Sequence, residues 1–212
     1  MILVAGDIGG TKSHLALFVA QNQELKLLTE ETYRSIDYPG LEEIVCRFVT
    51  SKRTEIGPEQ ISKACLAVAC PVVGQSCKMP NLPWTVSALA IKKKTGIQEV
   101  KLINDLEASA YGIAQLSEDE IANLQEGSAD PEGHAALISA GTGLGEALLY
   151  RQENTLVPIA SEGGHADFAP RTELEIELLR YLLKRFQHVS YERVLSGPGL
   201  LNIYYFLRDA GY

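Results

Sequence analysis

The chain opens with MILVAGDIGGTK (residues 1–12), in which an apolar strand runs directly into a glycine pair and a threonine. A second turn of the same kind, AGTGLG, lies far downstream at residues 140–145. Glycine can adopt positive φ and lets backbone N–H groups approach phosphate oxygens, because it carries no Cβ. Asp7, inside the first turn, could hold a hydrated Mg²⁺ against those phosphates. The two turns predict two loops that close on one nucleotide, and the alternative is a pair of ordinary β-hairpin turns.

The composition is that of a globular protein. The chain has 212 residues, of which 46% are hydrophobic, and this is enough for one core or for two small domains. The net charge is −8, and the only basic run, Lys92-Lys93-Lys94, is interpreted as the polar side of a helix. Nucleic-acid binding needs clustered positive charge and is not expected. Neither a membrane span nor a secretory leader is expected, because the apolar runs are too short for either.

The four cysteines are Cys46, Cys65, Cys70 and Cys77. They show no CxxC spacing and lie in or near apolar segments, so we predict that they are reduced and mostly buried. Reduced thiols favour a cytoplasmic location.

The periodicity of apolar residues predicts three opening strands, followed by alternating helices and strands. The expected strands are 1–7, 13–20, 24–34, 64–70 and 99–103, and the expected helices are 41–49, 88–94 and 106–115. This order is typical of a mixed sheet flanked by helices.

After a polar segment at 125–133, predicted to be a surface loop, the opening pattern restarts. The expected strands are 135–140, 146–151 and 155–160, and the expected helices are 172–187 and 200–208. Thr172 and Glu175 form a predicted capping box. The buried face of the helix that follows is assigned to Leu174, Leu178, Leu179, Leu182, Leu183 and Phe186. The restart suggests an internal repeat. We place a domain boundary near residue 110, with the small α/β domain over 1–110 and an incomplete large domain over 111–212.

Asn104-Asp105 is the sharpest single feature of the chain. The pair follows an apolar strand and precedes a helix, which is where open α/β sheets place ligand contacts. A carboxylate at this point could accept a proton from a substrate hydroxyl group, as in phosphoryl transfer. An ordinary helix N-cap is an equally good interpretation of the position.

Two later segments offer further polar groups. SEGGHADFAP (161–170) contains Glu162 and His165, which can bind hydroxyl groups, hold a metal or simply stabilise a turn. YERVLSGPG (191–199) contains Glu192, for which a surface salt bridge is the default interpretation. The remaining histidines, His14, His134 and His188, belong to no cluster of candidate functional residues in the sequence.

Taken together, these stretches resemble the bacterial glucokinase family of sugar kinases. The motifs that carry the resemblance are, in chain order, GDIGGT (6–11), ACP (69–71), NLPW (81–84), IND (103–105), AGTGLG (140–145), EGGHADFAP (162–170) and ERVLSGPG (192–199). The resemblance implies an actin-like, ribonuclease-H-like ATPase fold, with two α/β domains and a cleft between them. It also implies transfer of the γ-phosphoryl group of ATP to the 6-hydroxyl of glucose.

The resemblance also implies the role of each site residue. Asp105 is the expected general base and a sugar contact, and the other expected sugar ligands are Asn104, Glu162, His165 and Glu192. Asp7 is expected to hold Mg²⁺ through water. The residues expected to bind ATP are Asp7, Gly9, Gly10, Thr11, Lys12, Gly141, Thr142, Gly143 and Gly145. Sites of this kind reject analogues that lack a hydroxyl group, because their own polar groups would stay unpaired.

The chain departs from the family pattern at two points. Lys12 stands where asparagine is expected, and a lysine here resembles the related repressor–open-reading-frame–kinase branch. That branch has a cysteine-rich zinc motif further along the chain. No cysteine follows Cys77, so this motif is not expected. The chain stops at Tyr212, whereas family members continue. We therefore expect an incomplete second domain, an incomplete adenosine site and exposed apolar surface that favours self-association, including a homodimer. The alternatives are a non-catalytic sugar-binding fragment, a kinase for another hexose or N-acetylhexosamine, and polyphosphate as the donor.

Overall fold

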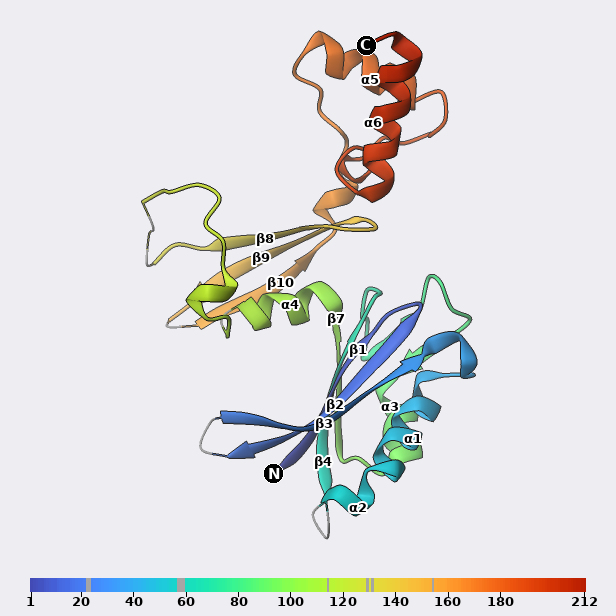
Figure 1. The fold of residues 1–212 in the computed structure, drawn as a ribbon, viewed down its shortest axis with the longest axis vertical. Coiled ribbons are helices and arrows are strands. Elements are labelled where there is room, and N and C mark those ends of the chain that lie inside the picture. Colours follow the sequence, from blue (N-terminus) through green and yellow to red (C-terminus); the bar gives the residue numbers. More distant parts are fainter. Residues whose placement is uncertain (22–23, 57–59, 114, 129, 131, 154) are drawn as a thin grey trace. The chain divides into compact units, whose positions relative to one another are not determined.

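The computed structural model of the chain divides into two compact units, Met1–Ala108 and Ser109–Tyr212 (Figure 1). The structure describes residues 1–21, 24–56, 60–113, 115–128, 130, 132–153 and 155–212. Of the predicted surface loop at 125–133, residues 129 and 131 lie outside the described residues. None of the described helices is both long and apolar enough to cross a membrane.

The first unit is built on a five-stranded mixed sheet with the order β3-β2-β1-β4-β7. Its strands are β1 (Ile2–Ile8), β2 (Lys12–Gln21), β3 (Glu24–Arg34), β4 (Ile61–Val68) and β7 (Glu99–Asn104). The first three strands form an antiparallel meander, and β1, β4 and β7 run parallel. The predicted mixed sheet with an opening meander is confirmed. The fourth strand lies slightly earlier than predicted, so Cys70 follows it.

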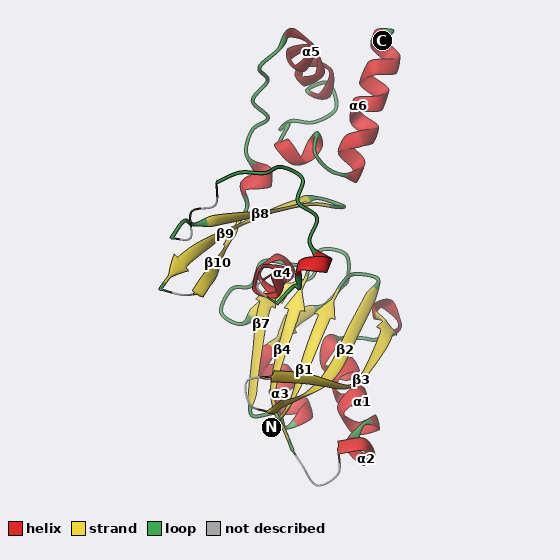
Figure 2. Cartoon of the chain, turned by 60° about the vertical axis from the view of Figure 1, so that its left-hand side comes forward, coloured by secondary structure: helices red, strands yellow, loops and turns green. Residues whose placement is uncertain are grey.

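Helices α1 (Leu41–Ser51) and α3 (Ala88–Thr95) lie side by side on one face of this sheet (Figure 2). The residues of α1 that recur at helical spacing, Leu41, Ile44, Val45 and Phe48, are buried against the sheet. Helix α3 ends where Gly96 adopts φ +79°, the left-handed conformation that glycine accepts without strain. The predicted polar side of α3 is confirmed, since Lys93 and Lys94 are exposed.

Two short strands were not predicted, β5 (Ser76–Lys78) and β6 (Thr85–Ser87), which form a small antiparallel hairpin. Its turn is fixed by Trp84, whose Nε1 donates to the backbone oxygen of Tyr38 at 3.1 Å. The other short elements are α2 (Arg53–Ile56), η1 (Ser35–Asp37), η2 (Glu118–Glu120), η3 (Gly163–His165) and η4 (Tyr191–Arg193).

The prediction that all four cysteines are reduced and mostly buried was wrong. Cys70 and Cys77 form a disulfide bond, and Cys65 is exposed on β4. The bond joins Cys70, in the loop after β4, to Cys77 in β5. The pairing could not be predicted because it depends on how this loop folds back. Only Cys46 and Cys65 are free.

The second unit contains a three-stranded antiparallel sheet with the order β10-β9-β8, from strands β8 (Ala135–Ala140), β9 (Leu144–Gln152) and β10 (Thr155–Ser161). Helix α4 (Asp105–Ile113) begins in the first unit and ends in the second. Helices α5 (Glu173–Leu182) and α6 (Gly197–Ala210) enclose a separate core. The buried residues of that core are Leu178, Leu182, Val189 and Phe206.

Helix α5 begins as predicted and ends early. The Thr172 side chain accepts from the Glu175 N–H and the Glu175 carboxylate accepts from the Thr172 N–H, so the capping box is confirmed. The helix ends at Leu182 rather than Gln187, and two leucines assigned to its buried face, Leu174 and Leu183, are exposed. Fewer leucines of this helix are therefore buried in the core than the leucine pattern predicted.

Candidate active site

The three parallel strands of the first unit bring several predicted site residues to one edge of the sheet. In the strand register, Ile8 of β1 lies beside Val68 of β4, and Val68 lies beside Asn104 of β7. Asp7 is exposed one residue before the end of β1, and Asp105 is exposed at the start of α4. The carboxyl ends of parallel strands are where α/β sheets bind ligands, so this edge is the candidate site of the first unit.

Asn104 is held by hydrogen bonds on both sides of its amide. Its Nδ2 donates to the backbone oxygen of Cys70 at 3.4 Å, and its Oδ1 accepts from the Leu106 N–H at 2.9 Å. The Asp105 Oδ1 also accepts from the Leu106 N–H, at 2.9 Å. Both side chains thus satisfy the free N–H at the start of α4, as helix caps do. The cap interpretation is confirmed, and a ligand role for the same groups stays a prediction.

The first glycine turn is held by Ser35, a buried serine that was not predicted as a site residue. The Gly9 N–H donates to the Lys12 oxygen at 2.8 Å, and the Ser35 hydroxyl donates to the Gly9 oxygen at 2.9 Å. The Ser35 N–H donates to the Thr11 oxygen at 3.0 Å, and its hydroxyl lies 3.0 Å from that of Ser13. Neither serine has a local sequence signal, because both act across strands that only the fold brings together.

The glycines of the two turns do not adopt positive φ. The expectation that these turns need glycine for its left-handed conformation was therefore wrong. Among the described glycines, only Gly74, Gly96 and Gly211 adopt positive φ. Space explains some of the turn glycines instead. A Cβ on Gly10 would lie 3.1 Å from the Cβ of Asn81, and one on Gly143 would lie 2.5 Å from Oε2 of Glu192.

The second glycine turn is tied to the Glu192 segment. The Gly141 N–H donates to the Gly143 oxygen at 2.8 Å, and the Gly197 N–H donates to the Gly141 oxygen at 2.8 Å. The carboxylate of Glu192 accepts from the Leu144 N–H at 3.0 Å. The surface-salt-bridge interpretation of Glu192 was therefore wrong: its carboxylate binds the backbone of the second turn, 48 residues away in sequence.

The Glu162–His165 turn lies in the same unit, next to the Glu192 segment. Backbone hydrogen bonds join residues 166 and 168 to residues 191 and 189. His165 Nδ1 lies 3.5 Å from Glu162 Oε2, and both side chains are exposed. The second unit thus brings together the turn at 141–145 and three of the predicted sugar ligands, Glu162, His165 and Glu192.

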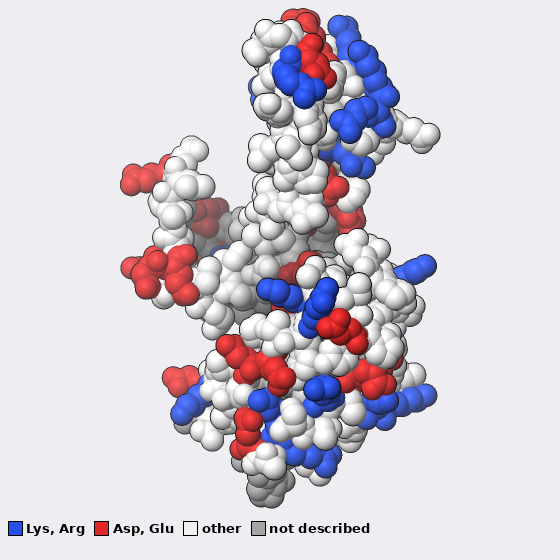
Figure 3. Space-filling model, turned by 45° about the vertical axis from the view of Figure 1, so that its right-hand side comes forward, with Lys and Arg blue, Asp and Glu red and all other residues white. Residues whose placement is uncertain are grey.

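All three histidines set aside in the sequence have defined partners. His14 Nε2 lies 3.2 Å from Oε2 of Glu30. His188 Nε2 lies 2.7 Å from a carboxylate oxygen of Asp167, and His134 Nδ1 accepts from the Arg151 N–H at 3.2 Å. Within the described ranges, no three side chains of His, Cys, Asp or Glu gather into a metal-binding group. On the face shown in Figure 3, basic and acidic side chains intermingle over the first unit. The ion pairs of this unit include Lys63–Glu99 and Lys94–Glu43.

A model of the glucokinase family matches residues 4–211 of the chain. The chain belongs to the glucokinase family. It is 46% identical over 211 residues to the glucokinase of Nostoc sp., covering 98% of this chain and 61% of that protein. It is 41% identical over 214 residues to the glucokinase of Synechocystis sp., covering 97% of this chain and 60% of that protein. The chain thus spans about three fifths of the length of the curated relatives it matches.

Solved structures of the family share the fold. A glucokinase from an Antarctic psychrotroph superposes with a TM-score of 0.82 at 31% identity, covering 99% of this chain and 65% of that one. A glucokinase from Balamuthia mandrillaris in complex with glucose gives a TM-score of 0.73 at 24% identity, covering 99% of this chain and 63% of that one. The predicted actin-like α/β fold of the sugar kinases is confirmed.

Proposed function

We propose that the protein transfers the γ-phosphoryl group of ATP to the 6-hydroxyl of glucose. The observation that carries the proposal is the family match over residues 4–211, which includes Asn104 and Asp105 at the carboxyl end of β7. The proposal assigns the chemical step and the phosphate turn at residues 9–12 to the first unit. It assigns the second turn and three sugar ligands to the second unit.

Asp105 is the proposed general base. Its exposed carboxylate accepts the proton of the 6-hydroxyl while that oxygen attacks the γ-phosphorus and ADP leaves. Because phosphoryl transfer depends mainly on positioning and charge, the cap at the start of α4 is the structural reason to place the base there. The hydrogen bond from the Leu106 N–H restricts where the carboxylate lies.

Sugar recognition is proposed to use Asn104, Glu162, His165 and Glu192. A sugar is uncharged and rich in hydroxyl groups, so its site needs side chains that can accept and donate several hydrogen bonds. Glu162 and His165 are exposed, and Glu192 Oε2 is already held by the second turn, which leaves its other carboxylate oxygen to bind sugar.

The phosphates of ATP are proposed to bind Gly9, Gly10, Thr11, Lys12 and the turn at 141–145, with Mg²⁺ held through water by Asp7. The residues present fit this ion, since Mg²⁺ usually takes one or two carboxylates together with phosphate oxygens and water. Asp7 is an exposed carboxylate beside the first turn. When bound, Mg²⁺ supplies positive charge that offsets the charge of the phosphates.

We further propose that the reaction takes place in the cytoplasm, as the first step of glycolysis. This proposal rests on the family match, because the Cys70–Cys77 bond removes the argument from reduced thiols. A homodimer stays a prediction that sedimentation or light scattering can check.

The test is a coupled ADP-release assay on the 212-residue chain with ATP, Mg²⁺ and glucose, with galactose and N-acetylglucosamine in parallel. A separate reaction with polyphosphate in place of ATP, which releases no ADP, is followed by the glucose 6-phosphate that it forms. Glucose-dependent ADP release that disappears in Asp105→Asn supports the proposal. If glucose protects the chain against thermal unfolding while neither donor yields product, the chain binds sugar but does not catalyse its phosphorylation.

A further inference from the structure

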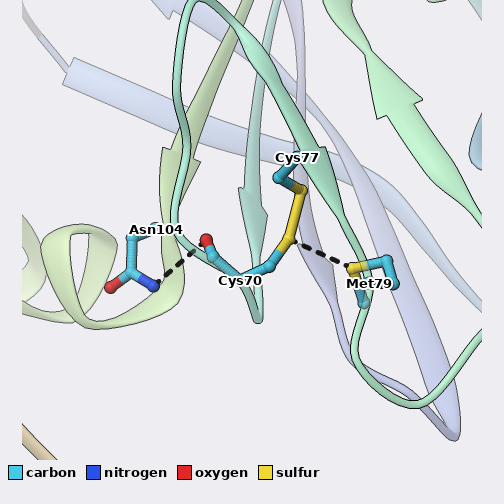
Figure 4. The surroundings of a disulfide bond; sticks show 4 residues. All are labelled: Cys70, Cys77, Met79 and Asn104. Atoms are coloured by element: carbon cyan, nitrogen blue, oxygen red, sulfur yellow. Dashed lines mark hydrogen bonds between the residues drawn. A yellow bond between two sulfur atoms is a disulfide. The ribbon is translucent and has the colours of Figure 1, made fainter.

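We infer that Cys70 and Cys77 form a reversible dithiol–disulfide pair whose oxidation state controls how firmly Asn104 is held (Figure 4). Through Asn104 the pair adjusts the affinity for sugar, a consequence that rests on the proposed function.

The two cysteines are placed for bond formation by the backbone. Their Cα atoms lie 6.2 Å apart, within the range of ordinary disulfides. Both residues are buried, and Cys70 Sγ lies 3.4 Å from Sδ of Met79. The bond closes the loop at residues 71–76, which connects β4 to β5. Reducing the bond therefore removes the covalent link between the two ends of this loop.

Cys70 is connected directly to the candidate site. Its N–H donates to the Val68 oxygen at 2.8 Å, and its own oxygen accepts from Nδ2 of Asn104 at 3.4 Å. Asn104 in turn accepts the Leu106 N–H at the start of α4. A shift of the Cys70 carbonyl therefore changes the orientation of the Asn104 amide and, through it, the first turn of α4.

The loop reaches β7 at a second point through Gln75. The Gln75 Oε1 accepts from the Leu102 N–H at 2.9 Å, and its Nε2 donates to the Leu102 oxygen at 3.4 Å. Gln75 and its neighbour Gly74 both adopt positive φ, at 60° and 58°. A left-handed conformation is unfavourable for glutamine and persists only where surrounding contacts enforce it. The closed loop thus holds β7 both at Leu102 and at Asn104.

The chemistry requires only a two-electron oxidant and a dithiol reductant. Two thiols lose two protons and two electrons to hydrogen peroxide, which becomes two molecules of water, and one S–S bond forms. Dithiothreitol reverses the reaction through a mixed disulfide, returning both thiols and leaving as a cyclic disulfide. Val73, in the middle of the loop, is 78% exposed, so opening of the loop admits small reagents to the buried sulfurs. In reducing compartments, disulfides that form are usually transient and regulatory.

The structural arm of the test uses mass spectrometry after peroxide or dithiothreitol treatment and alkylation, together with amide hydrogen exchange over residues 99–106. We expect the Cys70–Cys77 bond after oxidation, and exchange of the Leu106 amide about fivefold faster in the reduced chain. Cys77→Ser should match the reduced chain under both treatments. Cys65→Ser removes a free, exposed cysteine on β4 and should keep the full response. If a variant fails to fold, dithiothreitol-treated wild-type chain supplies the same reduced state.

The functional arm compares glucose phosphorylation in the two states. We expect the KM for glucose to be about fivefold higher in the reduced chain, with kcat within about twofold, a typical size for coupling between two sites. If the bond forms while Leu106 exchange and KM stay the same, the inference is overturned. If Leu106 exchange differs between the oxidised and reduced chain but neither state binds or phosphorylates glucose, the proposed function is wrong. The inference that the cysteine pair controls Asn104 is then still supported.

Discussion

The meander β1–β2–β3 of the first unit and the meander β8–β9–β10 of the second have the same strand order and a glycine turn at the same place. Their surroundings differ. In the first, β1 also pairs with β4, and Leu15 and Leu17 of β2 are fully buried. In the second, β8 pairs only with β9 among the described residues, and Ile138 and Leu148 are 62% and 57% exposed.

The local sequence pattern of a meander determines how its strands pair. The elements packed against the meander determine which of its side chains are buried. Alternating apolar residues and a glycine turn are enough to set strand pairing in both meanders. Burial depends on the parallel strands and helices that cover the sheet, because only they remove apolar area from water. The same pattern therefore contributes very differently to stability in the two units.

The largest expected effect distinguishes the chemical roles of the two units. Asp105→Asn should lower kcat about 10²–10⁴-fold with little change in the KM for glucose, because the amide has nearly the same shape but cannot accept a proton. His165→Ala in the second unit should raise KM about tenfold, which corresponds to the loss of one hydrogen bond. Steady-state kinetics with varied glucose measures both values. Unchanged turnover in Asp105→Asn would remove the base assignment.

A second pair of variants tests the difference in burial directly. Leu17→Ala should lower the free energy of unfolding of the first unit by about 2–5 kcal/mol, because the residue is fully buried. Leu148→Ala should change the stability of the second unit by less than about 0.5 kcal/mol, because its side chain is largely exposed. Urea unfolding followed by Trp84 fluorescence reports on the first unit, and amide exchange of β9 reports on the second. Equal losses would contradict the comparison.

A smaller effect is expected at the second glycine turn. A Cβ on Gly143 would displace the end of the Glu192 side chain, so Gly143→Ala should free the Leu144 N–H and raise its exchange rate about fivefold. A Cβ on Gly141 would meet nothing within 4 Å, so Gly141→Ala should leave Leu144 protection intact. Hydrogen exchange by NMR separates the two variants. Equal exchange in both would show that Glu192 does not hold the turn.

The smallest effect concerns the tyrosines of the two meanders at alkaline pH. Burial, with the nearby Glu31 carboxylate, raises the pKa of Tyr33 well above its ordinary value, so the folded protein keeps this phenol protonated. The stabilisation is present below the unfolded pKa of about 10 and is lost as pH rises above it, when the unfolded chain ionises first.

Tyr33→Phe should remove part of the alkaline loss of stability. At neutral pH it should change stability by less than about 0.5 kcal/mol, because the Tyr33 hydroxyl has no hydrogen-bond partner among the described residues. Tyr150, which is 49% exposed on β9, is the matched control for removing a phenol hydroxyl from the other meander. The measurement is unfolding between pH 8 and 11, followed by Trp84 fluorescence for the first unit and by amide exchange of β9 for the second. Identical profiles for the wild type and Tyr33→Phe would contradict the prediction.

Local patterns predicted much of the fold. Strand β3 was predicted and observed at 24–34, and the capping box of α5 depends on residues only three positions apart. The end of α5 was missed because the leucine periodicity continues beyond the point where its core ends. The β5–β6 hairpin was missed because its strands, of three residues each, are too short to show a period.

The site was predicted where strand order alone positions residues. Asn104 and Asp105 follow a strand, so their place at the edge of the sheet could be inferred. The Glu192–Leu144 hydrogen bond and the Cys70–Cys77 bond could not, because they depend on loops that the sequence does not orient. The two units contain different parts of the predicted residue set, and the roles of those residues stay predictions for the kinetic tests.

The side chain of Gln75 has one further consequence. Its amide presents one acceptor and one donor to Leu102, as a neighbouring peptide group would. Because β7 is the last strand of its sheet, a single side chain occupies the outer hydrogen-bonding groups at this point. Exposed strand edges are templates for pairing between molecules. Gln75 therefore covers, at Leu102, backbone groups through which the edge of β7 could otherwise pair with a strand of another molecule.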